Sequence, residues 1–240
     1  MYKFLRNLAD ARNFGGLRSS SLISWLIFHY TANDGDTDEA NANYFAGRSV
    51  GASAHYFVDD DSVTQSVPEE RIAFAVGGAK WADCPLTGGG RCYGRAGNYN
   101  SISIEMCDTR RDGRYDFSEA TLQNAAELGA KLIVKYGIPL EHVICHFDVN
   151  GKHCPGVEGW FGKDRSEWLK FKERVFLMTG KEIYEALVTY LATLPESGWS
   201  VNEGGFNAAT DAGLMDGTKP QGLLSREQLA AVLFRAGIIK

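Results

Sequence analysis

Two histidines and one cysteine stand where they could hold a divalent metal ion. His29 and His146 each close a short apolar run, and Cys154 follows His146 by eight residues through a turn-rich segment. Two imidazoles and a thiolate are good zinc ligands, and three protein ligands leave a fourth position for water, as in catalytic zinc sites. Zinc lowers the pKa of bound water to roughly 7. The spacing alone leaves open that both histidines are hydrogen-bonded structural residues and that Cys154 is a small buried hydrophobe.

The elements that would position these residues alternate between strands and helices, which predicts an α/β domain. Leu22 to Phe28 lacks helical spacing and is typical of a buried strand that ends at His29. A glycine-rich stretch over 77–98 predicts a long loop, and such loops usually serve a site. Further strands are expected at 54–58, 63–67, 101–107 and 143–145, and helices from Asp36 to about 47, from Ser118 to 136, from Asp164 to about 178 and around 183–191.

The strand at 101–107 carries a candidate acid–base residue. Ile102 and Ile104 alternate with Ser103 and Glu105, so Glu105 lies on the face opposite the isoleucines. Taken alone, the pattern favours a solvated strand residue at Glu105 and a solvated loop residue at Lys152.

Three motifs together resemble one family. They are His29-Tyr-Thr-Ala32, Ser101-Ile-Ser-Ile-Glu-Met-Cys-Asp108 and His146-Phe-Asp-Val-Asn-Gly-Lys-His-Cys-Pro-Gly156. In this order they resemble the zinc N-acetylmuramoyl-L-alanine amidases, in the branch that includes phage endolysins and peptidoglycan recognition proteins. The resemblance covers roughly residues 15–175. It implies a central mixed β-sheet flanked by helices.

The resemblance also implies residue roles. His29, His146 and Cys154 would bind one Zn²⁺ per chain, Glu105 would act as general base or orienting group, and Lys152 would stabilise the oxyanion. One departure concerns the residue before His55, which is Ala54 where many relatives have Trp or Tyr. The catalytic role of that Tyr in one branch is therefore not carried over. His55 either lines the cleft or is an ordinary strand histidine.

The loop over 77–98 precedes the Glu105 strand and is predicted to form a wall of the substrate cleft. Aromatic and arginine side chains suit sugar faces and peptide carboxylates. Cys84 and Cys92 lie eight residues apart; we expect free thiols, although an oxidising setting would allow them to pair. The predicted substrate-binding residues are Trp81, Arg91, Tyr93, Arg95 and His55.

The composition of the chain limits the classes of binding partner that can be expected. Thirty acidic residues against 25 basic ones give a net charge of −5, and no long basic block is present. Nucleic acid is not expected as a partner, because phosphate neutralisation needs clustered Lys and Arg. The longest apolar run is far short of the roughly 20 residues of a membrane helix, so no membrane insertion is expected. No apolar signal segment is visible at the start, which favours synthesis in the bacterial host cytoplasm and holin-type release.

The C-terminal segment is expected to be a separate small unit. The predicted organisation is a catalytic domain over 1–178, a helical linker over 179–194 and a helical module over 195–240. Ser225 and Gln228 form a capping box there. The module resembles one surface-layer homology repeat, which implies wall binding or self-association into a homo-oligomer. The alternative is a helical extension that covers the main domain.

The predicted function is hydrolysis of the amide bond between N-acetylmuramic acid and L-alanine in bacterial peptidoglycan by a zinc endolysin. A non-catalytic peptidoglycan-binding protein of the same fold is the alternative. Such relatives typically lose the thiolate ligand, whereas Cys154 is present. If the protein served only in structural assembly, Glu105 and Lys152 would have no functional role.

Overall fold

The computed structural model describes residues 2–195, 197–223, 225–236 and 238. The chain divides into two compact units, Met1–Gly180 and Lys181–Lys240.

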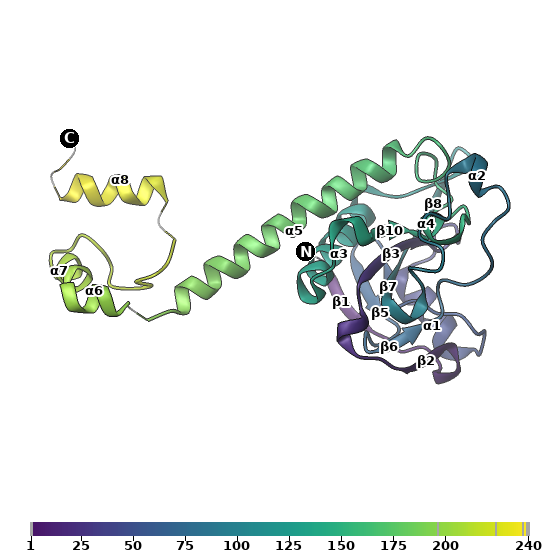
Figure 1. Cartoon of the computed structure of the whole chain (residues 1–240), viewed down its shortest axis with the longest axis horizontal. Coiled ribbons are helices and arrows are strands. Elements are labelled where there is room, and N and C mark those ends of the chain that lie inside the picture. Colours follow the sequence, from purple (N-terminus) through teal and green to yellow (C-terminus); the bar gives the residue numbers. More distant parts are fainter. Residues whose placement is uncertain (1, 196, 224, 237, 239–240) are drawn as a thin grey trace. The chain divides into compact units, whose positions relative to one another are not determined.

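A six-stranded mixed sheet forms the centre of the first unit (Figure 1). Its spatial order is β1 (Lys3–Arg6), β5 (Ser62–Gln65), β4 (Tyr56–Val58), β7 (Ser101–Met106), β3 (Trp25–Tyr30) and β10 (Val143–Cys145). Only the β4–β5 pair is antiparallel. The expected α/β fold with a mixed sheet and flanking helices is thereby confirmed. Because β3, β7 and β10 are parallel, their carboxyl ends meet at one edge, where ligands bind in open α/β sheets.

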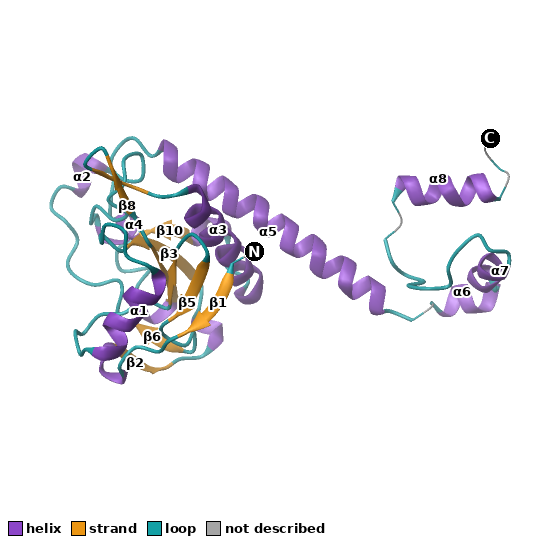
Figure 2. Cartoon of the chain, turned by 180° about the vertical axis from the view of Figure 1, so that it is seen from behind, coloured by secondary structure: helices purple, strands orange, loops and turns teal. Residues whose placement is uncertain are grey.

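Side-chain alternation assigns the two faces of the sheet to different layers. Leu26, Phe28, Ile102 and Ile104 point to one face and pack against α3 (Glu119–Tyr136) and the beginning of α5 (Ser166–Thr193). The opposite face carries Trp25, Ile27, His29, Ser103 and Glu105 and is approached by α1 (Asp38–Gly47), α2 (Cys84–Thr87) and α4 (His146–Asn150); Figure 2 shows these helices around the sheet. The active-site candidates therefore share the face opposite the main apolar core.

Several predicted elements are confirmed with small shifts. The hairpin of β4 and β5 and the helix capped by Ser118 and ended by Gly137 lie where expected. The strand before His29 begins at Trp25, because residues 20–22 form a short 3₁₀-helix. The first helix begins after Thr37, whose hydroxyl accepts the Ala40 N–H, so Asp36 is not its cap.

Two predictions about segments were wrong. The segment after His146 was expected to be turn-rich, but residues 146–150 form α4, which ends at Gly151 in the left-handed region. The two helices expected over 164–178 and around 183–191 are one helix, α5, which continues through Gly180. No proline interrupts α5, and an isolated glycine inside a helix costs only about 1 kcal/mol. Asp164 does accept the Ser166 N–H just before α5 begins.

Two small strand pairs complete the first unit. β2 (Phe14–Leu17) pairs with β6 (Arg71–Ala73), and β8 (Thr109–Arg111) pairs with β9 (Arg114–Asp116). The β8–β9 turn is Asp112-Gly113, and both residues have positive φ. This Asp-Gly dipeptide is typical of a two-residue hairpin turn.

The second unit contains the end of α5 and three further described helices. These are α6 (Gly198–Glu203), α7 (Gly205–Asp211) and α8 (Arg226–Arg235). The predicted capping box of Ser225 and Gln228 is confirmed. Val201, Leu229 and Phe234 remain exposed. Among the described residues, no helix combines the length and apolar character that a membrane crossing requires.

Candidate active site

The parallel register of β3 and β7 places His29 beside Glu105. The two residues are partners across the strands, and they follow apolar residues that fix both strands in the sheet. Glu105 Oε1 lies 3.9 Å from His29 Nδ1. A one-residue shift of either strand would turn its side chain to the other face. The buried alternation of Ile102, Ile104 and Met106 therefore sets the position of Glu105.

The next strand brings the other two candidate ligands to the same edge. β10 pairs with β3, and His146 follows β10 as the first residue of α4. The chain then returns, so that Cys154 Sγ lies 3.7 Å from His29 Nδ1. The ring centroids of His29 and His146 are 4.8 Å apart. The donor atoms of His29, His146 and Cys154 all lie within 4.8 Å of one another.

Unpaired buried atoms in this cluster fit a metal ion. The three residues are 1, 3 and 2% exposed, respectively. Within the described residues, both ring nitrogens of His146, Nε2 of His29 and Oε2 of Glu105 have no hydrogen-bond partner. Buried polar atoms are rarely left without partners. A divalent ion would take one nitrogen from each ring, and a set of two imidazoles and a thiolate favours zinc.

The electrostatics keep both histidines in the form that binds metal. Burial, reinforced by the charge of Lys152, lowers the pKa of His146 to about 3, and burial also lowers the pKa of His29. Both rings are therefore neutral at pH 7. Burial, followed by the nearby Glu105, raises the pKa of the Cys154 thiol. Coordination to a metal ion would deprotonate this thiol.

Glu105 lies in a buried setting that favours its neutral form, whereas Lys152 is exposed. Burial raises the pKa of Glu105 to about 8, while the charge of Lys152 opposes this shift. Lys152 itself is exposed, two residues before Cys154. A bound cation would favour the ionised form of Glu105. The site thus contains a carboxylate that can take up and release a proton, Glu105, and an exposed cation near the ligand cluster, Lys152.

The loop over 77–98 holds α4 in place. Its backbone N–H groups donate to the carbonyls of α4: Gly90 to Phe147, Cys92 to Asp148 and Trp81 to Asn150. In so short a helix most carbonyls lack a partner inside the helix, although the Phe147 carbonyl also accepts the Gly151 N–H. Gly151, with φ of 91°, ends α4 against the loop, and a Cβ there would collide with the sulfur of Cys84. The loop therefore positions the helix that carries His146.

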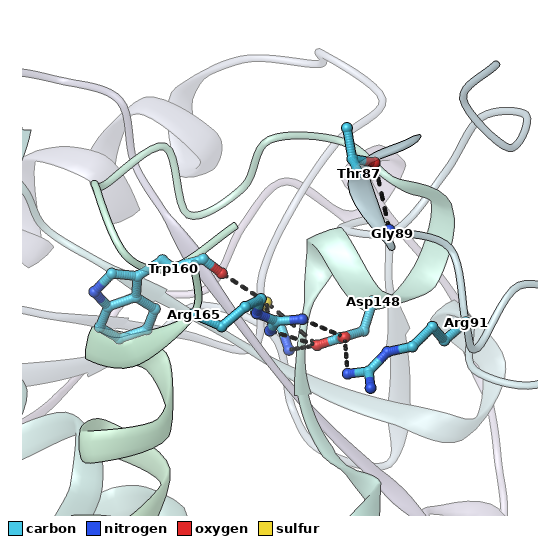
Figure 3. Close-up of polar contacts among 7 residues, drawn as sticks. Thr87, Gly89, Arg91, Asp148, Trp160 and Arg165 are labelled. Carbon is cyan, nitrogen blue, oxygen red and sulfur yellow. Dashed lines mark hydrogen bonds and ion pairs between the residues drawn. The ribbon is translucent and has the colours of Figure 1, made fainter. Parts of the chain in front are cut away.

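A buried carboxylate fixes the other side of α4. Asp148, whose side chain is 1% exposed, accepts Arg165 Nη1 at 2.7 Å and Arg91 Nη2 at 2.6 Å (Figure 3). Its second oxygen accepts the Cys145 N–H at 3.2 Å and Arg165 Nη2 at 3.0 Å. Burial acts to raise the pKa of Asp148, but the hydrogen bonds and charge of Arg165, followed by those of Arg91, lower it to about 2. Asp148 and Arg165 were not identified from the sequence, although Asp148 lies within the third motif.

The predicted substrate-binding residues have different surroundings. Trp81 and Tyr93 are 43 and 47% exposed, and the Trp81 ring lies beside His153. Arg91 is bound to Asp148, and the Arg95 guanidinium lies over the Trp25 ring. Arg91 and Arg95 thus have contacts within the protein, whereas much of Trp81 and Tyr93 is open to a ligand.

His55 does not fit the expectation that it lines the cleft. It is 1% exposed, and its Nδ1 accepts the Ser103 N–H. Its Nε2 lies 2.8 Å from Arg18 Nη2 and 3.2 Å from the Arg71 carbonyl. Both ring nitrogens are engaged within the protein, so His55 connects neighbouring segments. Cys84 and Cys92 are free thiols, as expected.

Comparison with known proteins places this site in a family. The family model described as "N-acetylmuramoyl-L-alanine amidase" matches residues 19–157, which contain all three candidate ligands. The amidase CwlL of Bacillus licheniformis is 30% identical over 193 residues, covering 76% of this chain and 49% of CwlL. The amidase BlyA of Bacillus subtilis is 30% identical over 203 residues, covering 82% and 53%. The chain thus spans about half the length of these curated relatives.

Solved structures agree with this assignment. The catalytic domain of XlyA has 25% identity and a TM-score of 0.55, and the match covers 72% of this chain and 99% of that domain. The structure of PlyL has 26% identity and a TM-score of 0.55, with 72 and 96% covered. A mutant endolysin from Bacillus subtilis has the same TM-score. On the sequence match and the shared fold, the chain belongs to the N-acetylmuramoyl-L-alanine amidase family.

Proposed function

We propose that this protein is a zinc-dependent amidase that cleaves the bond between the lactyl group of N-acetylmuramic acid and L-alanine in peptidoglycan. The observation that carries the proposal is the convergence of His29, His146 and Cys154 beside Glu105. Family membership and the names of the relatives support the substrate. When bound, zinc would polarise the scissile carbonyl and lower the pKa of water.

Glu105 is proposed as the group that moves the proton. It would accept a proton from the attacking water and deliver it to the departing amine of L-alanine, which must leave protonated. Its position beside His29 borders the ligand cluster, and its side chain is 20% exposed. A carboxyl with a pKa moved toward neutrality is suited to both steps.

Lys152 is proposed to stabilise the oxyanion that forms during attack on the amide. Its charge lowers the pKa of His29, His146 and Glu105, which supports a position near the proposed reacting centre. A fixed positive charge there is worth several kcal/mol in the transition state. Trp81 and Tyr93, with exposed rings on the loop, are proposed to contact the glycan or the stem peptide.

The proposed setting is the bacterial cell wall. Similarity to endolysins supports a role in host lysis. For residues 195–240 we propose wall binding or self-association, which the exposed side chains of Val201, Leu229 and Phe234 support. The catalytic unit and this module would then correspond to two separate tasks.

The bond that is cleaved identifies the activity. Purified Gram-positive peptidoglycan is digested, and the released ends are identified by mass spectrometry. The proposal predicts intact stem peptides that begin with a free alanine amine, without new reducing sugar ends. Walls that bind the protein and remain uncut would instead support a non-catalytic recognition protein.

A further inference from the structure

A basic cavity lies on the side of α4 that carries Asp148. Its volume is about 740 Å³, within the range of small-ligand sites. It is lined by residues 85–88 and Arg91, by Gly162, Lys163 and Arg165, and by Trp168, Leu169 and Lys172 of α5. Four of the lining residues are cationic, and none is acidic; the cations are Arg91, Lys163, Arg165 and Lys172.

The positive charges that line this cavity outnumber the carboxylates that pair with them. Asp148 is the carboxylate that binds Arg91 and Arg165, and it is itself buried. Within the described part of the chain, no residue forms an ion pair or a side-chain hydrogen bond with the ammonium of Lys163 or Lys172. Lys172 is half-buried, and burial lowers its pKa; the charge of Asp148 opposes this shift, whereas the charges of Arg91 and Arg165 add to it. This excess of positive charge occurs in a chain whose net charge is −5.

The cavity is distinct from the metal cluster. His146 and Asp148 are two residues apart on α4, which separates their side chains by roughly 200° around the helix. None of the candidate metal ligands lines the cavity. Asp148 holds the guanidinium groups of Arg91 and Arg165 in fixed positions, as Figure 3 shows. The remaining N–H groups of Arg91 are available, because its side chain is 66% exposed.

We propose that this cavity is a binding site for a phosphate group. Two lysines without protein partners and an oriented arginine favour an anion with several acceptor oxygens. A phosphate monoester carries about −1.5 to −2 charges at pH 7, and a phosphodiester polymer carries one charge on each successive unit, so both supply more negative charge than one carboxylate. Leu86 and Leu169 at the rim are exposed and can contact the carbon atoms next to the phosphate. The source is either a free phosphate or a wall polymer whose units are joined by phosphodiesters.

Direct binding to the full chain tests this site without any turnover, so failure here is separate from failure of the proposed amidase activity. Inorganic phosphate and glycerol 3-phosphate are titrated by calorimetry into the wild type and into Lys163→Gln/Lys172→Gln. We expect saturable binding that weakens at least about tenfold in the double variant, because two charge-assisted hydrogen bonds are lost. Binding that is absent in the wild type, or equal in the double variant, would overturn the proposal.

Two further variants keep the test specific. Lys170→Gln removes a charge from the same helix, but Lys170 pairs with Glu167 outside the cavity, so phosphate binding should be unchanged. Lys172→Arg keeps the charge and should retain most of the binding. A loss of similar size in Lys170→Gln would mean that only the overall charge matters, which contradicts a built site.

Wall binding then distinguishes the two sources. Walls with and without their phosphodiester polymers, removed by hydrofluoric acid, are compared in sedimentation assays. Weaker binding to stripped walls, and only for the protein with intact lysines, would identify the polymer. Equal binding to both walls, with phosphate binding retained, would identify a small phosphate as the ligand.

Discussion

The three candidate metal ligands come from three segments, and each is held by its own local structure. His29 ends a buried strand, His146 begins α4, and Cys154 lies in the returning segment. The sequence identified all three as candidates because three motifs together resemble one family; their spacing alone left structural roles open. It could not predict that His55 would be buried, since its partner Arg18 is 37 residues away and only the fold brings them together.

Substitution of the thiolate ligand tests the metal assignment. Cys154→Ser should weaken zinc binding by more than about a hundredfold, beyond the loss seen when only a group outside the ligand shell is changed. The hydroxyl of serine stays protonated near pH 7, whereas a metal-bound thiol does not. Zinc content after dialysis and amidase activity should fall together. Cys92→Ser, a half-buried loop cysteine outside the cluster, serves as the control; stoichiometric zinc in Cys154→Ser would refute the assignment.

Substitution of Glu105 separates chemistry from metal binding. Glu105→Gln should lower the turnover number by about 10²–10⁴, the usual contribution of a positioned acid–base group. Zinc content and the unfolding temperature should stay near those of the wild type, because Glu105 borders the ligands without belonging to them. Near-normal turnover in this variant would transfer the proton-moving role to another group.

Among the elements that position the candidate site, helix α4 was not predicted from the sequence. The sequence indicated a turn over its five residues, because the residues that stabilise this helix lie at distant positions in the chain. Arg91 lies 57 residues away from Asp148, and Arg165 lies 17 residues away. A single sequence does not reveal which arginine reaches a given carboxylate. The strands and the long helix α3 were predictable, because their periodicity and caps are local.

The contact between α4 and the loop over 77–98 predicts that substitution of Gly151 destabilises the first unit. Gly151→Ala should destabilise the first unit by about 2 kcal/mol or more, since positive φ is strained for alanine and the new Cβ meets Cys84 and Trp81. Zinc affinity should fall as well, because α4 carries His146. Denaturant unfolding and competition with a chelator measure the two effects.

Gly94 offers a matched control for that experiment. It also has positive φ, but a Cβ there meets no atom within 4 Å. Gly94→Ala should therefore show the backbone strain alone and leave zinc affinity unchanged. Equal losses of zinc affinity in both variants would mean that the contact between loop and α4 does not position the ligand.

The start of α1 predicts a pH dependence of stability. Burial, with the nearby Asp59, raises the pKa of Asp38 to about 7. The folded protein keeps this proton where the unfolded chain, with a pKa of 3.8, has lost it. This contribution to stability is therefore present below about pH 4 and is lost as the pH rises through about 7.

Asp38→Asn should remove this dependence. Relative to the variant, the wild type should lose on the order of 2 kcal/mol of unfolding free energy between pH 4 and pH 8. Thermal unfolding of both proteins at several pH values measures the difference, and Asp36→Asn at the exposed neighbouring carboxylate is the control. A difference that does not change with pH would show that Asp38 ionises normally in the folded protein.

At the scale of the whole molecule, the candidate catalytic residues all lie in the first unit, Met1–Gly180. The boundary between the units falls inside α5. No local change in composition marks this boundary, because the helical spacing of apolar residues continues across it. The module over 195–240 carries exposed apolar side chains but none of the candidate ligands. The proposed activities of the two units should therefore be separable.

Truncation after Leu194 tests this separation. The shortened chain should cleave soluble muramoyl-peptides at a rate near that of the full chain. Its binding to whole walls, or its mass in sedimentation equilibrium, should fall, depending on whether the module binds walls or self-associates. If neither changes, residues 195–240 have neither proposed role.

The central claim is that one bound zinc ion and this set of residues hydrolyse the muramoyl–alanine amide. The most direct measurement is a titration of chelator-treated protein with zinc, in which the hydrolysis rate of a soluble muramoyl-peptide is followed against bound metal. We expect no hydrolysis without metal and a rate that rises linearly until one zinc ion per chain is bound. Hydrolysis by the metal-free protein, or stoichiometric zinc binding without hydrolysis, would contradict it.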